Sequence, residues 1–274
     1  MQQLLFGGNL LLFQNSWEQY RLNFKSALVF ALLLVFVPAF SFFQNIYVSS
    51  GSIFIDYNLA QANPLELLAE AGLIALFLLF YSFFVSVIIF SVRKNLSPLK
   101  LQFYLHEMIR KFALRLFAFF LLFCLLLFLL MSAMIALGAP LALAGIILLA
   151  ASFLLMFVPQ AVVIDEEGLK HALSSNFDFL FHSPRPFAII AVVGVALLAL
   201  LQIVEFALAQ FTMLSPYISL LIALVFIFPF IEVMKTYMYM MRFDLIKRHE
   251  IAKRKKPLFF GPDPESIAAV FPKK

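Results

Sequence analysis

The chain has 274 residues, of which 64% are hydrophobic and only 13% are charged, whereas soluble proteins are roughly 45–50% apolar and about 25% charged. This composition excludes an ordinary soluble domain, and the single cysteine excludes an intrachain disulfide and a cysteine cluster for a redox or zinc centre. The net charge of +5 does not indicate nucleic-acid binding, because the basic residues flank apolar segments and do not form a patch with interleaved aromatic residues.

The N-terminal segment lacks the positive region and the small-residue cleavage site of a signal peptide, so we expect it to be retained. Trp17 and Tyr20 lie beside Arg21 and Lys25, a mixture that is typical of the headgroup layer of a membrane. The segment therefore predicts an interfacial helix ahead of the first apolar segment.

Six apolar segments follow, whose lengths suit helices that cross about 30 Å of hydrocarbon, with the first at the lower length limit. They predict an all-α, polytopic transmembrane bundle of six helices with short cytoplasmic interfacial helices. We expect a single transmembrane domain over residues 1–242 and a basic, proline-containing cytoplasmic tail over residues 243–274. The predicted spans are about 27–43, with a kink at Pro38, then 70–92, 113–137, 141–163, 187–213 and 217–241.

The segments between the spans carry signals of their own. A short β-hairpin is predicted around Gly51. After the Ser-Pro pair at 97–98, apolar residues recur at helical spacing and predict an amphipathic helix on the membrane surface. After the fourth span, Asp165 is the expected N-cap of a further interfacial helix, with Glu166 and Glu167 in its first turn. An interfacial helix thus precedes spans one, three and five, and three duplicated hairpins are an alternative description of the chain.

The distribution of basic residues predicts the orientation. Of the 20 lysine and arginine residues, 19 lie in the N-terminal segment, the loops near residues 93–115 and 164–187, and the tail, and only Lys235 lies inside a span. Basic residues collect on the cytoplasmic side of a membrane. We therefore expect a multi-pass protein of the cell membrane with both termini in the cytoplasm.

The acids that follow the fourth span lie on this otherwise basic side. We expect them to contact the basic loop near residues 93–115, and His182 to pair with Asp178, four residues earlier on the same helix. The candidate cytoplasmic interface comprises Asp165, Glu166, Glu167, His182, Arg110 and Lys111.

Charged groups inside a span are costly and are candidate functional residues. The candidate intramembrane polar network comprises Gln202, Glu205, Glu232 and Lys235. Glu232 and Lys235 share a helix face and can neutralise each other. A proton- or ion-coupled pathway would use such a set; alternatively, Lys235 extends to the headgroup layer and Glu205 binds neighbouring helices in a structural role.

The start of the tail contains basic residues that would contact anionic lipid headgroups: Lys247, Arg248, Lys253, Arg254, Lys255 and Lys256. They would equally serve as a topology anchor. The last residues are either a peptide ligand for a cytosolic partner or a disordered tail. The sequence contains no nucleotide, hydrolase or metal-binding motif, so no cofactor, metal or catalytic residue is expected.

Three segments together suggest a family: NSWEQYRLNFKSALVF, FVPQAVVIDEEGLKHALSSNFDFL and TYMYMMRFDLIKR. They resemble the six-helix prokaryotic membrane-domain superfamily that includes the membrane region of glycerophosphodiester phosphodiesterases and stand-alone uncharacterised membrane proteins. The matching positions are Pro159, 165–168, Ala172, Leu173, Ser174 or Ser175, Tyr239 and Arg242. The resemblance implies a fold and a membrane location. It carries no activity over, because catalysis in those enzymes belongs to a separate barrel domain, and about 30 residues after the last span are far fewer than the roughly 200 that a barrel needs.

These observations together predict a non-enzymatic scaffold, assembly or membrane-organising factor. Its partners would be the lipid bilayer and another membrane or cytosolic protein. The alternative is a small transporter or channel that uses Glu205, Glu232 and Lys235.

Overall fold

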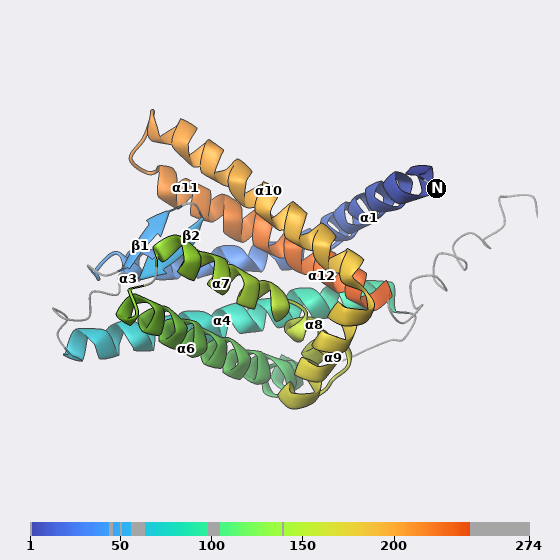
Figure 1. Cartoon of the computed structure of the whole chain (residues 1–274), viewed down its shortest axis with the longest axis horizontal. Helices are drawn as coiled ribbons and strands as arrows, with labels where there is room; N and C mark the ends of the chain where they lie inside the picture. The colour runs from blue at the N-terminus through green and yellow to red at the C-terminus, as the bar shows by residue number, and fades with distance from the viewer. Residues whose placement is uncertain are drawn as a thin grey trace, which may run out of the picture.

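The computed structural model describes residues 2–43, 46–49, 51–55, 64–97, 105–138 and 140–241. The described elements are α1 (Gln2–Leu22), α2 (Phe24–Ala27), η1 (Leu28–Val35), α3 (Phe36–Phe40), β1 (Ile46–Ser49), β2 (Ser52–Ile55), α4 (Pro64–Leu96), α5 (Leu105–Met108), η3 (Ile109–Ala113), α6 (Leu114–Ala136), α7 (Leu141–Leu154), α8 (Val158–Ile164), α9 (Leu169–His182), α10 (Pro184–Ala209), α11 (Ser215–Ile222), η4 (Ala223–Ile227) and α12 (Phe228–Met241). Figure 1 shows the long helices side by side, with the β-hairpin at one end of the bundle and α9 at the other.

Five helical segments are long and apolar enough to cross a membrane: Pro64–Leu96, Ile109–Ala136, Gly145–Ile164, Pro184–Ala209 and Ser215–Met241. A sixth exists if the bent pair Leu12–Leu22 and Phe24–Phe40 forms one span. The all-α class is confirmed, and the five or six apolar helices fit a multi-pass membrane protein.

The chain bends where the predicted interfacial helix meets the first apolar segment. The helices Leu12–Leu22 and Phe24–Phe40 are bent by 74° relative to each other. Asn23 holds the bend: its amide donates to the carbonyl oxygen of Gln19 over 2.8 Å, and its Oδ1 accepts hydrogen bonds from Ser91 at 2.6 Å and from Asn95 at 2.9 Å. Because these two partners belong to α4, packing against a neighbouring helix sets the direction of the chain here.

The predicted hairpin around Gly51 is confirmed. Strands β1 and β2 are antiparallel, with Ile46 opposite Ile55 and Ser49 opposite Ser52. Gly51 has a φ of +70°, in the left-handed region that a glycine adopts without steric cost. The hairpin contacts α11.

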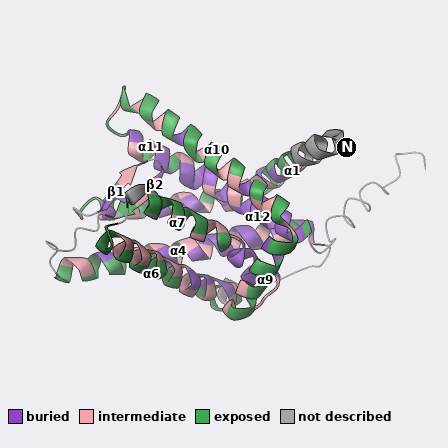
Figure 2. Cartoon of the chain, viewed as in Figure 1, coloured by how far each residue is buried: buried purple, intermediate pink, exposed green. Residues whose placement is uncertain are grey.

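The core surrounds α4 and α12, which pack against each other, while α1 packs on α12. In Figure 2 the buried residues concentrate in these helices, whereas α10 and much of α6 are exposed. The share of residues buried in the most apolar part of each span differs widely. It is 61% for Ser215–Met241, but only 17% for Ile109–Ala136 and 11% for Pro184–Ala209. Apolar helices with so little cover have the surface expected of segments that contact lipid.

The predicted fourth span is two helices, α7 and α8, separated by a break at Leu155–Phe157. Asn176 of α9 satisfies the backbone at this break. Its Oδ1 accepts from the backbone N–H of Phe157 at 3.1 Å, and its amide donates to the carbonyl oxygen of Leu154 at 2.8 Å. Asn176 is fully buried, so α9 is locked onto the end of the bundle through a break in a span.

Candidate functional site

The predicted intramembrane set is divided between two places. Glu232 and Lys235 lie together in α12, with 5% and 7% of their surfaces exposed. Glu205 lies on α10 beside the β-hairpin, and Gln202 is exposed on α10. The four side chains therefore do not form one network.

Glu232 and Lys235 form a buried ion pair with an N–O distance of 2.5 Å. The amide of Gln160 in α8 donates to the second oxygen of the Glu232 carboxylate over 2.9 Å. Lys235 also donates to the carbonyl oxygen of Met156 over 3.2 Å. Both carboxylate oxygens thus have donors, which is the condition under which a buried charge pair is tolerated.

Gln160 is a functional candidate that the sequence analysis missed. It is fully buried, and its Oε1 has no hydrogen-bond partner in the part of the chain that the structure describes. The sequence does mark this residue, because Gln160 is a single polar residue after Pro159 within an apolar run. Buried polar groups inside spans usually bond across helices.

Glu205 anchors the β-hairpin. Its carboxylate accepts a hydrogen bond from Ser49 at 3.2 Å and another from Ser219 of α11. The backbone N–H of Gly51 donates to the hydroxyl of Ser219 over 3.3 Å. A Cβ atom on Gly51 would lie 2.4 Å from the Leu201 side chain, so the turn sits tightly between α10 and α11. This is the arrangement of a polar group that joins neighbouring segments.

The predicted contact between the acids after the fourth span and the basic loop is confirmed for Glu166. Its carboxylate pairs with Arg93 of α4 at 3.2 Å and with Lys111 of η3. Arg93 also donates to the carbonyl oxygen of Val163, and Arg115 of α6 donates to that of Glu167 over 3.1 Å. Three basic residues from three elements therefore meet at the turn between α8 and α9.

Burial raises the pKa of Glu166, but the hydrogen bonds and positive charges of Lys111 and Arg93 outweigh it. The pKa of this carboxyl therefore lies below its ordinary value, and the group is ionised at neutral pH. Glu166 has a φ of +59°, a conformation that non-glycine residues rarely adopt and that surrounding contacts must hold in place.

The predicted capping role of the acids is wrong. Helix α8 ends at Ile164 and α9 begins at Leu169, with Gly168 at the N-cap and no acid in the first turn. Asp165 instead accepts a hydrogen bond from the hydroxyl of Tyr239 in α12 at 2.5 Å, and Glu167 accepts one from Ser175 at 3.0 Å. These two carboxylates therefore bind side chains of α12 and α9 and do not cap the start of α9.

The other predicted interface residues take no part in this cluster. His182 bonds the backbone carbonyl of Asp178 at 2.8 Å and not its carboxylate, and Arg110 is exposed. The six predicted lipid-binding residues from Lys247 to Lys256 lie outside the described residues.

Two apolar hollows lie near the hairpin end of the bundle, and neither is lined by Glu205, Glu232 or Lys235. Within the described part of the chain, no three His, Cys, Asp or Glu side chains are grouped so as to hold a metal ion. Comparison of the chain with models of protein families, with curated proteins and with solved structures finds no match.

Proposed function

We propose that the chain is a non-enzymatic membrane scaffold, which organises or assembles other components at the membrane. The observation that carries this proposal is that Glu232 and Lys235 are already paired with each other. Each charge neutralises the other in the core, and the Gln160 amide fills the remaining acceptor of the carboxylate. Such a neutralised pair, bonded to Gln160 and to the Met156 carbonyl, offers no net charge to a passing ion.

The proposal includes a topology of six spans in the cell membrane with both termini in the cytoplasm, where the first span is the predicted segment of about residues 27–43. It is supported by the gathering of Arg93, Lys111 and Arg115 at one end of the bundle, because basic residues favour the cytoplasmic side. An active periplasmic or extracellular reporter fused to the C-terminus, with an inactive cytoplasmic one, would contradict this orientation.

The tail and α9 would supply the binding surfaces. Lys247 to Lys256 carry the charge to attract anionic headgroups at roughly 1 kcal/mol for each basic side chain, and the remaining tail would bind a membrane or cytosolic protein. Membership of the six-helix membrane-domain superfamily is part of the proposal and rests on the three sequence segments that resemble it.

The alternative is a small proton- or ion-coupled transporter. The unpartnered Oε1 of Gln160 beside Glu232 favours it, because a buried acceptor next to a carboxylate can accept a proton-bearing group or water.

Substitution of the acids separates the two functions. In cells lacking the native copy, Glu205→Gln and the double variant Glu232→Gln with Lys235→Met should restore the wild-type phenotype if the protein is a scaffold and the variants insert normally. In vesicles that enclose a pH-sensitive dye and carry an imposed potential, the wild-type chain should conduct no more protons than protein-free vesicles. Proton flux that the double variant Glu232→Gln with Lys235→Met loses, while it inserts normally, would establish the transporter.

A further inference from the structure

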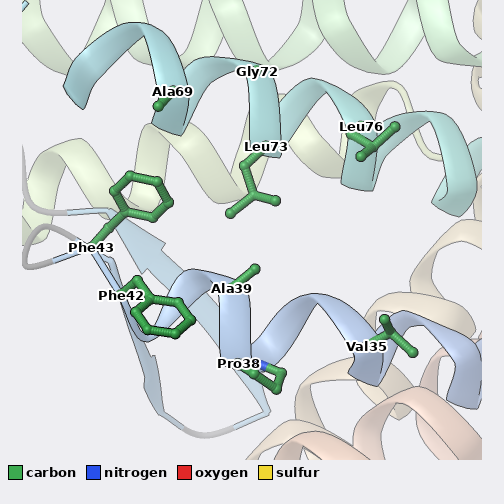
Figure 3. Close-up of a pocket in the computed structure, with 9 residues that line it drawn as sticks. All are labelled: Val35, Pro38, Ala39, Phe42, Phe43, Ala69, Gly72, Leu73 and Leu76. Atoms are coloured by element: carbon green, nitrogen blue, oxygen red, sulfur yellow. The ribbon is translucent and has the colours of Figure 1, made fainter. Parts of the chain in front are cut away.

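A hollow of about 650 Å³ lies between the first apolar segment and the start of α4 (Figure 3). Its volume falls within the roughly 300–1,000 Å³ typical of ligand sites. All nine lining residues are apolar: Val35, Pro38, Ala39, Phe42, Phe43, Ala69, Gly72, Leu73 and Leu76. We call it the α3–α4 groove.

The shape of the groove follows from small residues on α4. Figure 3 shows Ala69 and Gly72 on the wall opposite Phe42 and Phe43, with Leu73 directed toward α3. A Cβ atom on Gly72 would meet nothing within 4 Å. The absence of a side chain at this position therefore leaves space that neighbouring side chains do not fill.

The position of the groove along α4 places it at one boundary of the bilayer. Gly72 lies 21 residues before Arg93, a separation of about 31 Å at 1.5 Å per helical residue. This matches the roughly 30 Å of hydrocarbon in a bilayer. If Arg93 lies at one headgroup layer, Gly72 lies where the hydrocarbon ends on the other side.

The charge beyond the groove selects a headgroup. Glu66 lies three residues before Ala69, on the same side of α4, and about 9 Å outside Gly72 along the helix. It therefore lies at the level of the headgroups. A carboxylate there attracts the ammonium group of a zwitterionic lipid and repels an anionic headgroup.

From this arrangement we propose that the α3–α4 groove binds one acyl chain of a zwitterionic phospholipid, with the headgroup ammonium at Glu66. The lipid is a resident of the fold and not one of the rapidly exchanging lipids around it, because the concave walls contact the chain from two elements. The proposal rests on membrane insertion and is independent of the scaffold role.

The test is retention of lipid by the full chain. The protein is reconstituted in vesicles of equal parts phosphatidylethanolamine and phosphatidylglycerol, extracted in mild detergent and weighed by native mass spectrometry. Wild type should retain one phosphatidylethanolamine. Gly72→Leu should lower the occupancy of this lipid about tenfold. This is the loss expected when roughly two methylene groups of the acyl chain are no longer buried in the groove. Gly145→Leu is the matched control, because Gly145 also meets nothing within 4 Å but lies on α7.

Two more variants make the result decisive. Ala69→Leu narrows the groove from an exposed position of the helix and should lower lipid occupancy as Gly72→Leu does. Circular dichroism shows whether each variant is folded, and the second variant decides the outcome if the first misfolds. Glu66→Gln should retain lipid but lose the preference for phosphatidylethanolamine. Equal retention by wild type and both groove variants would overturn the proposal, as would a lipid-free wild-type chain or a lipid-free dimer.

Discussion

Removal of one partner from the buried ion pair of α12 should destabilise the protein more than removal of both. In Lys235→Met the carboxylate of Glu232 keeps the Gln160 amide but loses the ammonium group 2.5 Å away, in a site where both residues are more than nine-tenths buried. Breaking a buried pair in this way costs about 3–5 kcal/mol. We expect the lower end, about 3 kcal/mol, because the carboxylate keeps the hydrogen bond from the Gln160 amide.

The double variant Glu232→Gln with Lys235→Met should lie within about 1 kcal/mol of wild type, because no uncompensated charge stays in the core and an amide can still bond Gln160. The assay is equilibrium unfolding in mixed micelles, followed by the fluorescence of the only tryptophan. Trp17 lies 5.9 Å from the Phe230 ring of α12, so it reports on packing of α1 against the helix that carries the pair.

Lys170→Met is the control, because Lys170 is exposed on α9 and exposed substitutions usually change stability by less than about 0.5 kcal/mol. A Lys235→Met variant as stable as this control would refute the reasoning. It would mean that water reaches Glu232 and that the pair is not sealed, which would favour the transporter.

Three further predictions concern the ends of the bundle. Gly51→Ala should cost about 1–3 kcal/mol through its left-handed backbone and its clash with Leu201, whereas Gly145→Ala in the same unfolding assay should be neutral or slightly stabilising. Asn176→Leu should cost about 2 kcal/mol or more, because it leaves two buried backbone groups at the α7–α8 break without partners; a loss equal to that of an exposed control would contradict this role. The lowered pKa of Glu166 contributes stability that is present above its unfolded pKa and is lost as the pH falls through its folded pKa. The difference in unfolding midpoint between wild type and Glu166→Gln should therefore be large at pH 7 and shrink below about pH 4. A difference that grows on acidification would contradict the stabilising role of the ionised carboxylate.

The apolar helices, the hairpin at Gly51 and the contact of Glu166 with the basic loop could be predicted from the sequence. Each depends on a local property: hydropathy over a segment, a glycine between two β-prone runs, or opposite charges that flank spans on one face. Such properties act within a few residues of the chain or through the membrane itself, and they hold whichever helices become neighbours.

Only the tertiary structure decided which polar groups meet. It placed Glu205 with Ser219 and the hairpin, placed Glu232 with Gln160, and gave Asp165 to Tyr239 in place of a helix cap. It also bent the chain at Asn23, where two residues of α4 bind the asparagine side chain. A hydrogen bond reaches about 3 Å, so its partner depends on the rotation and register of helices that are distant in sequence. The amino-acid sequence fixes that a buried polar group needs a partner, and the packing of the helices determines which one it finds.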